Sequence, residues 1–236
     1  MNARVASSLL ALGLATLSSS ALAFPGLDIG VGVAGLAGGS IIDKASGSDP
    51  ASQAYPGFAG TRVGIGGVLE ARFLGFLGVE AGYFVSTDKG DGDVKLLGKS
   101  ISATLGQSAS HIPVLVKLVA PIPMFAPFIG AGVDFVKPGS CESNLKLEGV
   151  TVPTTCYNDS YSMWTGALGA EISLPFFDMI RFPISLRGSA HRDFGDGLSD
   201  RGTITVDSTT GVPTSARLRS EWRYDVYGTV GASIFF

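Results

Sequence analysis

Residues 111–136 read HIPVLVKLVAPIPMFAPFIGAGVDFV and contain two strand patterns separated by a short connection. In 111–119, and again in 127–136, large apolar side chains alternate with small, polar or charged ones. A period of two is typical of a β-strand with one apolar face. The connection APIPMF, at 120–125, is short and apolar. This stretch therefore predicts a β-hairpin with a tight turn.

The same alternation recurs along the chain and predicts eight strands. Their ranges are 27–38, 60–73, 77–85, 111–119, 127–136, 161–174, 180–192 and 227–236. The connections at 73–76, 120–125 and 175–179 are short, whereas those near 38–57, 86–108, 138–160 and 193–219 are long and polar. Short turns on one side and long loops on the other are the layout of a transmembrane β-barrel. A soluble β-sandwich gives no reason for such alternation.

The composition supports a membrane barrel. The 236 residues include 33 glycines, 45% hydrophobic residues and only 16% charged residues, against a usual charged share of about a quarter. After the N-terminal segment, no uncharged apolar run is long enough for a spanning helix. The predicted fold is therefore all-β: an eight-stranded antiparallel up-and-down transmembrane β-barrel with short periplasmic turns and four long extracellular loops.

The first 23 residues have the layout of a secretory signal peptide. Arg4 precedes an apolar run over 9–17, and the small-residue site Ala21-Leu22-Ala23 follows. A buried N-terminal helix is the less favoured alternative. The predicted domains are therefore a signal peptide, 1–23, and a barrel, 24–236. The formal net charge of −3 argues against a nucleic-acid partner.

Aromatic residues are predicted to form a girdle at each rim of the barrel. Those near the short turns are Phe24, Phe73, Phe76, Phe125, Phe128, Phe176, Phe177, Phe182, Phe235 and Phe236. Those towards the long loops are Tyr83, Phe135, Tyr161, Trp164, Trp222 and Tyr224.

The second face of the strands carries few but balanced charges. The predicted interior set is Asp28, Arg62, Glu70, Arg72, Glu80, Lys117, Asp134, Glu171, Arg181, Arg187, Arg223 and Asp225. An eight-stranded barrel is just wide enough for its own side chains, and an isolated buried ion costs several kcal/mol. We therefore expect a plug of paired charges. A polar gate or narrow ion path is the alternative.

Two cysteines, Cys141 and Cys156, lie in the third long connection. In an exported chain an even pair predicts a disulfide, which would close a loop of about sixteen residues and contribute about 3 kcal/mol. A metal site formed by the two thiols is the alternative, but no histidine lies nearby in the sequence to complete it.

The sequence offers no strong enzyme signature. A nucleophile elbow, phosphate-binding loop, dinucleotide motif and metal-ligand cluster are all missing from it. Ser189, His191 and Asp193 share a strand face in SAHRD, but in a line that does not place the imidazole between two partners. His111, like His191, lies near a long-loop end. We expect no catalytic site, cofactor or metal.

Three segments give the chain a family resemblance: SHIPVLVKLVAP with APFIGAGVDF, ISLRGSAHRDFG, and the terminal YGTVGASIFF. With them the chain resembles the OmpA/OmpX-like outer-membrane β-barrel superfamily. The resemblance implies a bacterial outer-membrane location, contact with outer-membrane lipid and lipopolysaccharide, and insertion by the outer-membrane assembly machinery. That machinery would recognise the last strand through Tyr224, Val226, Val230, Ile234 and Phe236.

The expected role is structural or interactional: membrane integrity, adhesion or recognition through extracellular loops whose ligand is unknown. A small channel, or an OmpW-like conduit for ions or small hydrophobic molecules, is the alternative. An outer-membrane lipid-modifying enzyme is a third possibility.

Overall fold

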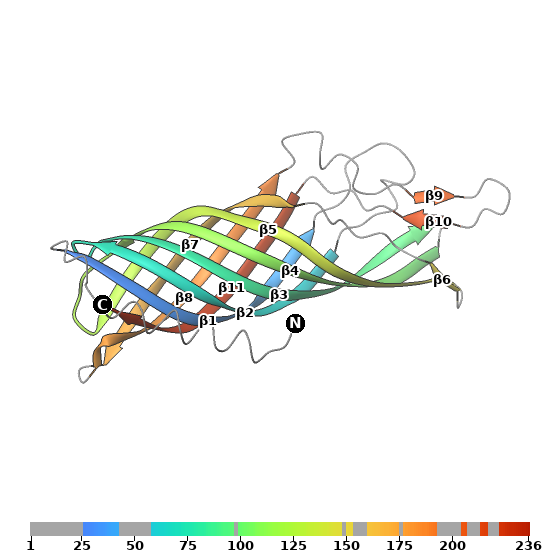
Figure 1. Cartoon of the computed structure of the whole chain (residues 1–236). Coiled ribbons are helices and arrows are strands. Elements are labelled where there is room, and N and C mark those ends of the chain that lie inside the picture. Colours follow the sequence, from blue (N-terminus) through green and yellow to red (C-terminus); the bar gives the residue numbers. More distant parts are fainter. Residues whose placement is uncertain are drawn as a thin grey trace, which may run out of the picture.

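A closed antiparallel barrel forms the body of the computed structural model (Figure 1). The structure describes residues 26–42, 58–96, 99–147, 150–152, 160–174, 177–192, 204–206, 213–216 and 222–236. The eight barrel strands in this part of the chain are β1 (Leu27–Ile42), β2 (Phe58–Phe73), β3 (Leu77–Leu96), β4 (Lys99–Val119), β5 (Phe125–Leu147), β7 (Tyr161–Leu174), β8 (Phe177–Arg192) and β11 (Trp222–Phe235). The predicted fold class is confirmed.

The remaining strands are short and lie outside the wall of the barrel. Strand β6 (Val150–Val152) pairs with the far end of β5, and β9 (Ile204–Val206) pairs with β10 (Pro213–Ala216). In the described ranges, no helix is long and apolar enough to cross a membrane.

The last strand closes the barrel against the first. Strand β11 pairs with β1 from Gly30↔Phe235 to Ile42↔Arg223, and with β8 on its other side. The Phe236 N–H donates to the Ile29 carbonyl at 2.9 Å, and the Ile29 N–H donates back to Phe236 at 3.1 Å. The apolar C-terminus is therefore a paired strand of the wall.

The outward face of each strand is apolar and exposed. Val33, Ile65 and Trp164 are 60–69% exposed, and along β7 exposed and buried residues alternate as predicted. A continuous exposed apolar surface around a closed barrel is stable only where lipid covers it. The barrel is therefore a transmembrane one.

The aromatic girdles differ from the prediction in three side chains. Phe73, Phe76, Phe125 and Phe236 are 44–56% exposed at the short-turn rim. Phe128 and Phe235, however, point inward and are only 6% exposed, because neighbouring positions of a strand point to opposite faces. Tyr161 also lies on the inner face, where its hydroxyl accepts a hydrogen bond from Arg223. Phe24 and Phe176 lie outside the described residues, as do the side chains of Phe177 and Trp222.

The strands on one side of the barrel run much further than predicted. Strands β3 and β4 pair as far as Leu96↔Lys99, so most of the predicted loop at 86–108 is a β-hairpin. Strand β5 continues alongside β4 to Leu145, although its pairing with β7 ends at Val136↔Tyr161. Backbone pairing needs no apolar face, so this extension leaves no period-two hydrophobic signal.

Two predictions from the sequence fall outside the described part of the chain. The signal peptide, 1–23, is one. The other is the disulfide: Cys141 lies in β5, opposite Gln107 in the β4 register, but Cys156 is not among the described residues. The disulfide stays a prediction.

A closed barrel has no free edge from which unfolding can start. We therefore expect the purified protein to migrate faster on a denaturing gel when it is not boiled than when it is boiled. Truncation after Asp225, which removes most of β11, should abolish the difference. Equal mobility of the full-length protein in the two samples would contradict the closed barrel.

Candidate functional site

The barrel interior gathers most of the charges that the sequence places on the inner face. Ten of the twelve are buried: Arg62, Glu70, Arg72, Glu80, Lys117, Asp134, Glu171, Arg187, Arg223 and Asp225. The Arg181 side chain is 22% exposed at the short-turn end and contacts Glu171. Asp28 is partly exposed, and with the described residues it makes no ion pair.

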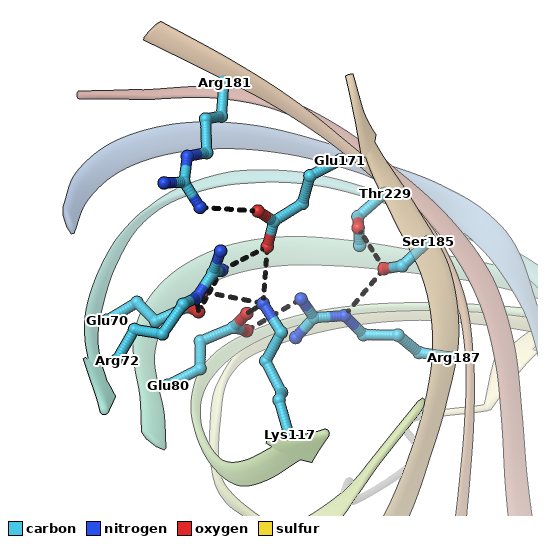
Figure 2. Close-up of polar contacts among 9 residues, drawn as sticks. All are labelled: Glu70, Arg72, Glu80, Lys117, Glu171, Arg181, Ser185, Arg187 and Thr229. Carbon is cyan, nitrogen blue, oxygen red and sulfur yellow. Dashed lines mark hydrogen bonds and ion pairs between the residues drawn. The ribbon is translucent and has the colours of Figure 1, made fainter. Parts of the chain in front are cut away.

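The lower network lies nearer the short turns and comprises Glu70, Arg72, Glu80, Lys117, Glu171, Arg181 and Arg187 (Figure 2). At its centre, Lys117 Nζ lies 2.6 Å from Glu70, 3.2 Å from Glu80 and 3.4 Å from Glu171. Arg72 bridges Glu70 and Glu171 at 2.5 and 2.6 Å. Arg187 reaches Glu80 at 2.7 Å. These side chains come from five strands, so the network ties opposite walls of the barrel together.

Glycines and inward phenylalanines complete the lower network. A Cβ on Gly78 would lie 2.9 Å from Glu70 Oε1, so a larger residue there would displace that carboxylate. Lys117 lies over the Phe128 ring at 4.3 Å, and Arg181 over the Phe235 ring at 4.2 Å. Cation–π contacts of this kind stabilise desolvated cations. The cavity left beside the network is only about 20 Å³, roughly enough for one water molecule.

The upper network lies nearer the long loops and comprises Arg62, Asp88, Arg223 and Asp225. Arg62 binds Asp88 through two hydrogen bonds of 2.7 and 2.9 Å and approaches Asp225 at 2.7 Å. Arg223 contacts the same two carboxylates at 2.5 and 3.2 Å. The Ser40 hydroxyl donates to Asp225 at 2.7 Å. Two cations and two anions thus form a closed, neutral layer.

Asp88 is a member of this network that sequence reasoning missed. The third strand was predicted to end at 85 because the outward apolar positions stop there. Strand β3 nevertheless continues, and Asp88 follows Phe84 and Ser86 on the inner face. That two-residue spacing was the available signal. With Asp88 in place of Asp28, six acidic residues face six basic ones in the described lumen.

Between the two networks, three adjacent strands bring together Ser86, His111 and Asp134. The Ser86 hydroxyl oxygen lies 3.0 Å from His111 Nε2, and His111 Nδ1 lies 2.9 Å from Asp134 Oδ2. Because a carboxylate only accepts, Nδ1 carries the proton towards Asp134, and a neutral ring then accepts the Ser86 proton at Nε2. This relay has the order of a nucleophile, base and acid.

Ser189 and His191, which the sequence analysis did not assign to a relay, make other contacts in the structure. Ser189 bonds the Thr165 hydroxyl at 2.8 Å, and His191 Nδ1 bonds the Ser162 carbonyl. Asp193 lies outside the described residues. Ser86, His111 and Asp134 are more than twenty positions apart in the sequence, and only the register of β3, β4 and β5 reveals their proximity.

The relay is closed to substrates in this conformation. Ser86, His111 and Asp134 are 1%, 3% and 0% exposed. Nucleophilic attack would need a substrate carbonyl at the Ser86 hydroxyl, and neighbouring side chains occupy that space. What the geometry supplies is a polar connection between three strands.

A groove of about 830 Å³ opens where β5 and β7 separate, at the long-loop end. Its lining takes residues from both faces of the wall: Tyr83, Val85 and Phe135 from the lipid side, and Ala109, Val136 and Tyr161 from the lumen side. Beyond Val136, strand β5 no longer pairs with β7. Pro138, which has no N–H, lies where that pairing is lost.

Comparisons with known proteins find similarity to solved structures of outer-membrane proteins. No protein-family model and no curated protein matches the chain. Solved structures that match include the outer membrane protein OprG from Pseudomonas aeruginosa (16% identity, 89% of this chain, 96% of that chain, TM-score 0.47). Others are Ail of Yersinia pestis, in complex with the heparin analogue sucrose octasulfate (10%, 89% and 99%, 0.34), and the outer membrane protease OmpT of Escherichia coli (7%, 93% and 99%, 0.38). At this level of similarity the matches carry no argument about function.

The two charge networks lead us to expect little ion conduction. Refolded protein in a planar lipid bilayer should show no stable stepwise conductance, because paired side chains fill the lumen. The double variant Glu80→Ala/Arg187→Ala removes one pair and should raise the frequency of small current steps. Large ion-selective steps in the unaltered protein would contradict a sealed lumen.

The relay should contribute to stability. Replacing His111 by Ala removes the hydrogen bond from Nδ1 to Asp134 Oδ2. Oδ1 of the same buried carboxylate has no hydrogen-bond partner among the described residues, so the loss should lower the free energy of unfolding by about 2–3 kcal/mol. Ser86→Ala should cost about 1 kcal/mol. Equilibrium urea unfolding in lipid vesicles would measure both. Ser110→Ala, on the outer face, is the matched control, and a His111→Ala effect no larger than that of the control would refute the relay.

Proposed function

We propose that this protein is a bacterial outer-membrane barrel with a structural or surface-interaction role, in which the barrel is a sealed anchor. The observation that supports this role best is the extension of β3, β4 and β5 beyond the aromatic girdle (Figure 1). Tyr83 is an exposed girdle residue, and Leu96 lies 13 positions further along β3. At about 3.3 Å per residue, that is roughly 40 Å of strand.

The sequence of the extension suits an aqueous surface. The segment 86–110 reads STDKGDGDVKLLGKSISATLGQSAS and is rich in Ser, Gly, Asp and Lys. A paired hairpin is a more rigid display surface than a loop, so binding to it would lose less conformational entropy. We propose that adhesion or recognition uses this hairpin together with the neighbouring loops.

The other parts of the proposal concern how the chain reaches and occupies the membrane. We propose that residues 1–23 direct export and that outer-membrane lipid and lipopolysaccharide surround the apolar belt. The assembly machinery would recognise the last strand through its exposed residues. The exposed side chains near this end of the chain are Tyr224, Val226, Val230, Ile234 and Phe236. Because they lie on one apolar face, they support the proposal that the machinery recognises that face.

A second candidate is a conduit for small hydrophobic molecules, favoured by the groove at the β5–β7 separation. Its lining residues belong to both faces of the wall, and a volume of several hundred Å³ suits a small ligand. A molecule entering from the long-loop side could pass sideways into lipid without crossing the charge networks. Catalysis is not part of either proposal, and we assign Ser86, His111 and Asp134 a structural role.

One experiment separates the two candidates. In a strain lacking the gene, we would express the full-length protein, a variant in which Asn-Gly replaces residues 90–105, and Ser162→Trp, which fills the groove. Lys89 and Gly106 are register partners, so a two-residue turn can join them. The measurements are attachment of the cells to plastic, resistance to SDS, and entry of the hydrophobic fluorophore N-phenylnaphthylamine.

We expect the variant with the shortened hairpin to return SDS resistance, but not attachment, to the strain lacking the gene. The Ser162→Trp variant should return both properties. If the fluorophore enters more slowly with Ser162→Trp than with the full-length protein, and the shortened hairpin has no such effect, the conduit is the better interpretation. Full attachment with the shortened hairpin would exclude the hairpin as the interaction surface. Heat-modifiable migration verifies that each variant folds.

A further inference from the structure

A second cavity, of about 370 Å³, lies at the short-turn mouth of the barrel. Its wall is largely apolar and includes Val119, Ile122, Met124 and Leu174, whereas Arg72, Ser173 and Arg181 supply polar groups. The β4–β5 turn forms one side, held by a hydrogen bond of 3.1 Å from the Ser173 N–H to the Met124 carbonyl. The cavity therefore combines an apolar wall with a polar floor, as small-molecule sites do.

The charge at this floor is not balanced within the lower network. Four cations (Arg72, Lys117, Arg181 and Arg187) face three carboxylates (Glu70, Glu80 and Glu171). Asp28, opposite Arg72 in the register, makes no ion pair with the described residues. The directly paired groups of the lower network thus carry a formal charge of +1, and Asp28 balances it without an ion pair to a described residue.

Arg181 is the cavity-lining cation with the fewest bonds to carboxylates. Its one ion pair with a described residue is the 3.5 Å contact to Glu171, and its side chain is 22% exposed. The Arg181 guanidinium carbon lies 4.2 Å from the centre of the Phe235 ring, over its face. In Figure 2, Arg181 lies at the edge of the network, and its one drawn contact is with Glu171. A guanidinium has five N–H donors arranged to bind a carboxylate or phosphate.

Ser173 lies beside Arg181 and can share the same ligand. The two residues are register partners on neighbouring strands, so their side chains leave the same face of the sheet. Both line the cavity. A serine hydroxyl donates one hydrogen bond, and an oxyanion can accept it while it accepts others from the guanidinium.

We propose that the short-turn mouth binds a small amphiphilic anion: an oxyanion head at Arg181 and Ser173, and a short apolar body against Val119, Ile122, Met124 and Leu174. The guanidinium at the polar end of the cavity disfavours cationic ligands, and the apolar wall disfavours bare inorganic anions. Because short turns face the periplasm, the ligand would arrive from that side. This inference is independent of the proposed surface role, which concerns the opposite end of the barrel.

The head group of such a ligand is either a carboxylate or a phosphate ester, and two probes distinguish them. Hexanoate and monohexyl phosphate have the same apolar body and different heads. Hexanol and hexylammonium keep the body but remove the anion. All four are short enough to be titrated as monomers against the full-length protein in detergent micelles. The amide NMR signals of Gly75, Met124 and Ser173 report binding, because these residues line the cavity.

We expect saturable shifts of these signals with at least one anionic probe and none with hexanol or hexylammonium. Arg181→Gln should weaken the binding about tenfold or more, as loss of a charge-assisted hydrogen bond does. Arg181→Lys should restore part of it. Lys89→Gln is the matched control, since it removes one positive charge at the opposite, long-loop end of β3 and should leave the affinity unchanged.

Three results would overturn the proposal. One is an equal affinity of Arg181→Gln and the unaltered protein. Another is an equal response to hexanol, which would indicate partition into the detergent. The third is the absence of any saturable shift with either anion. Heat-modifiable migration of Arg181→Gln keeps loss of binding distinct from loss of the fold, and Ser173→Ala gives a second, milder test of the same site.

Discussion

Backbone hydrogen bonding in lipid is the constraint on which this structure depends. No water is present in the bilayer core to satisfy an open N–H or carbonyl, so a sheet can cross it only as a closed barrel. Here closure depends on β11, which pairs with β1 over thirteen register positions and extends to the Ile29–Phe236 hydrogen bonds. The segment 223–236 must therefore be strand-like and apolar on one face as far as Phe236, where its pairing with the first strand ends.

Closure also determines what the other face can contain. The inner faces of eight strands enclose a space that their own side chains fill, so every charge there has lost most of its water and needs a partner. The two networks meet this need in different ways. In the upper network Arg62 and Arg223 pair with Asp88 and Asp225 in a closed, neutral layer. In the lower network Lys117 contacts three carboxylates. Both connect strands that are not neighbours in the wall.

The sequence predicts the wall well because alternation follows directly from the position of lipid. Outward residues such as Val33, Ile65 and Val230 are where the period of two places them. Prediction fails where lipid no longer dictates the pattern. The first part of the β3 extension, 86–93, reads STDKGDGD and has no large apolar residue on either face, so its strand character, and with it Asp88, gave no hydrophobic signal. Phe128 and Phe235 were assigned to the girdle by residue type, although their parity on the strand places them inside against Lys117 and Arg181.

The Ser86–His111–Asp134 relay shows a different limit of sequence reasoning. Its members follow no local motif, because the contact crosses three strands and depends on two registers at once. Whether the serine can act as a nucleophile also depends on the space around it. The residue types do not reveal that Ser86 is buried. A relay with the same bonds at an open mouth would be a candidate nucleophile. At this position, between two filled charge networks, it is one more way of satisfying polar side chains that closure has removed from water.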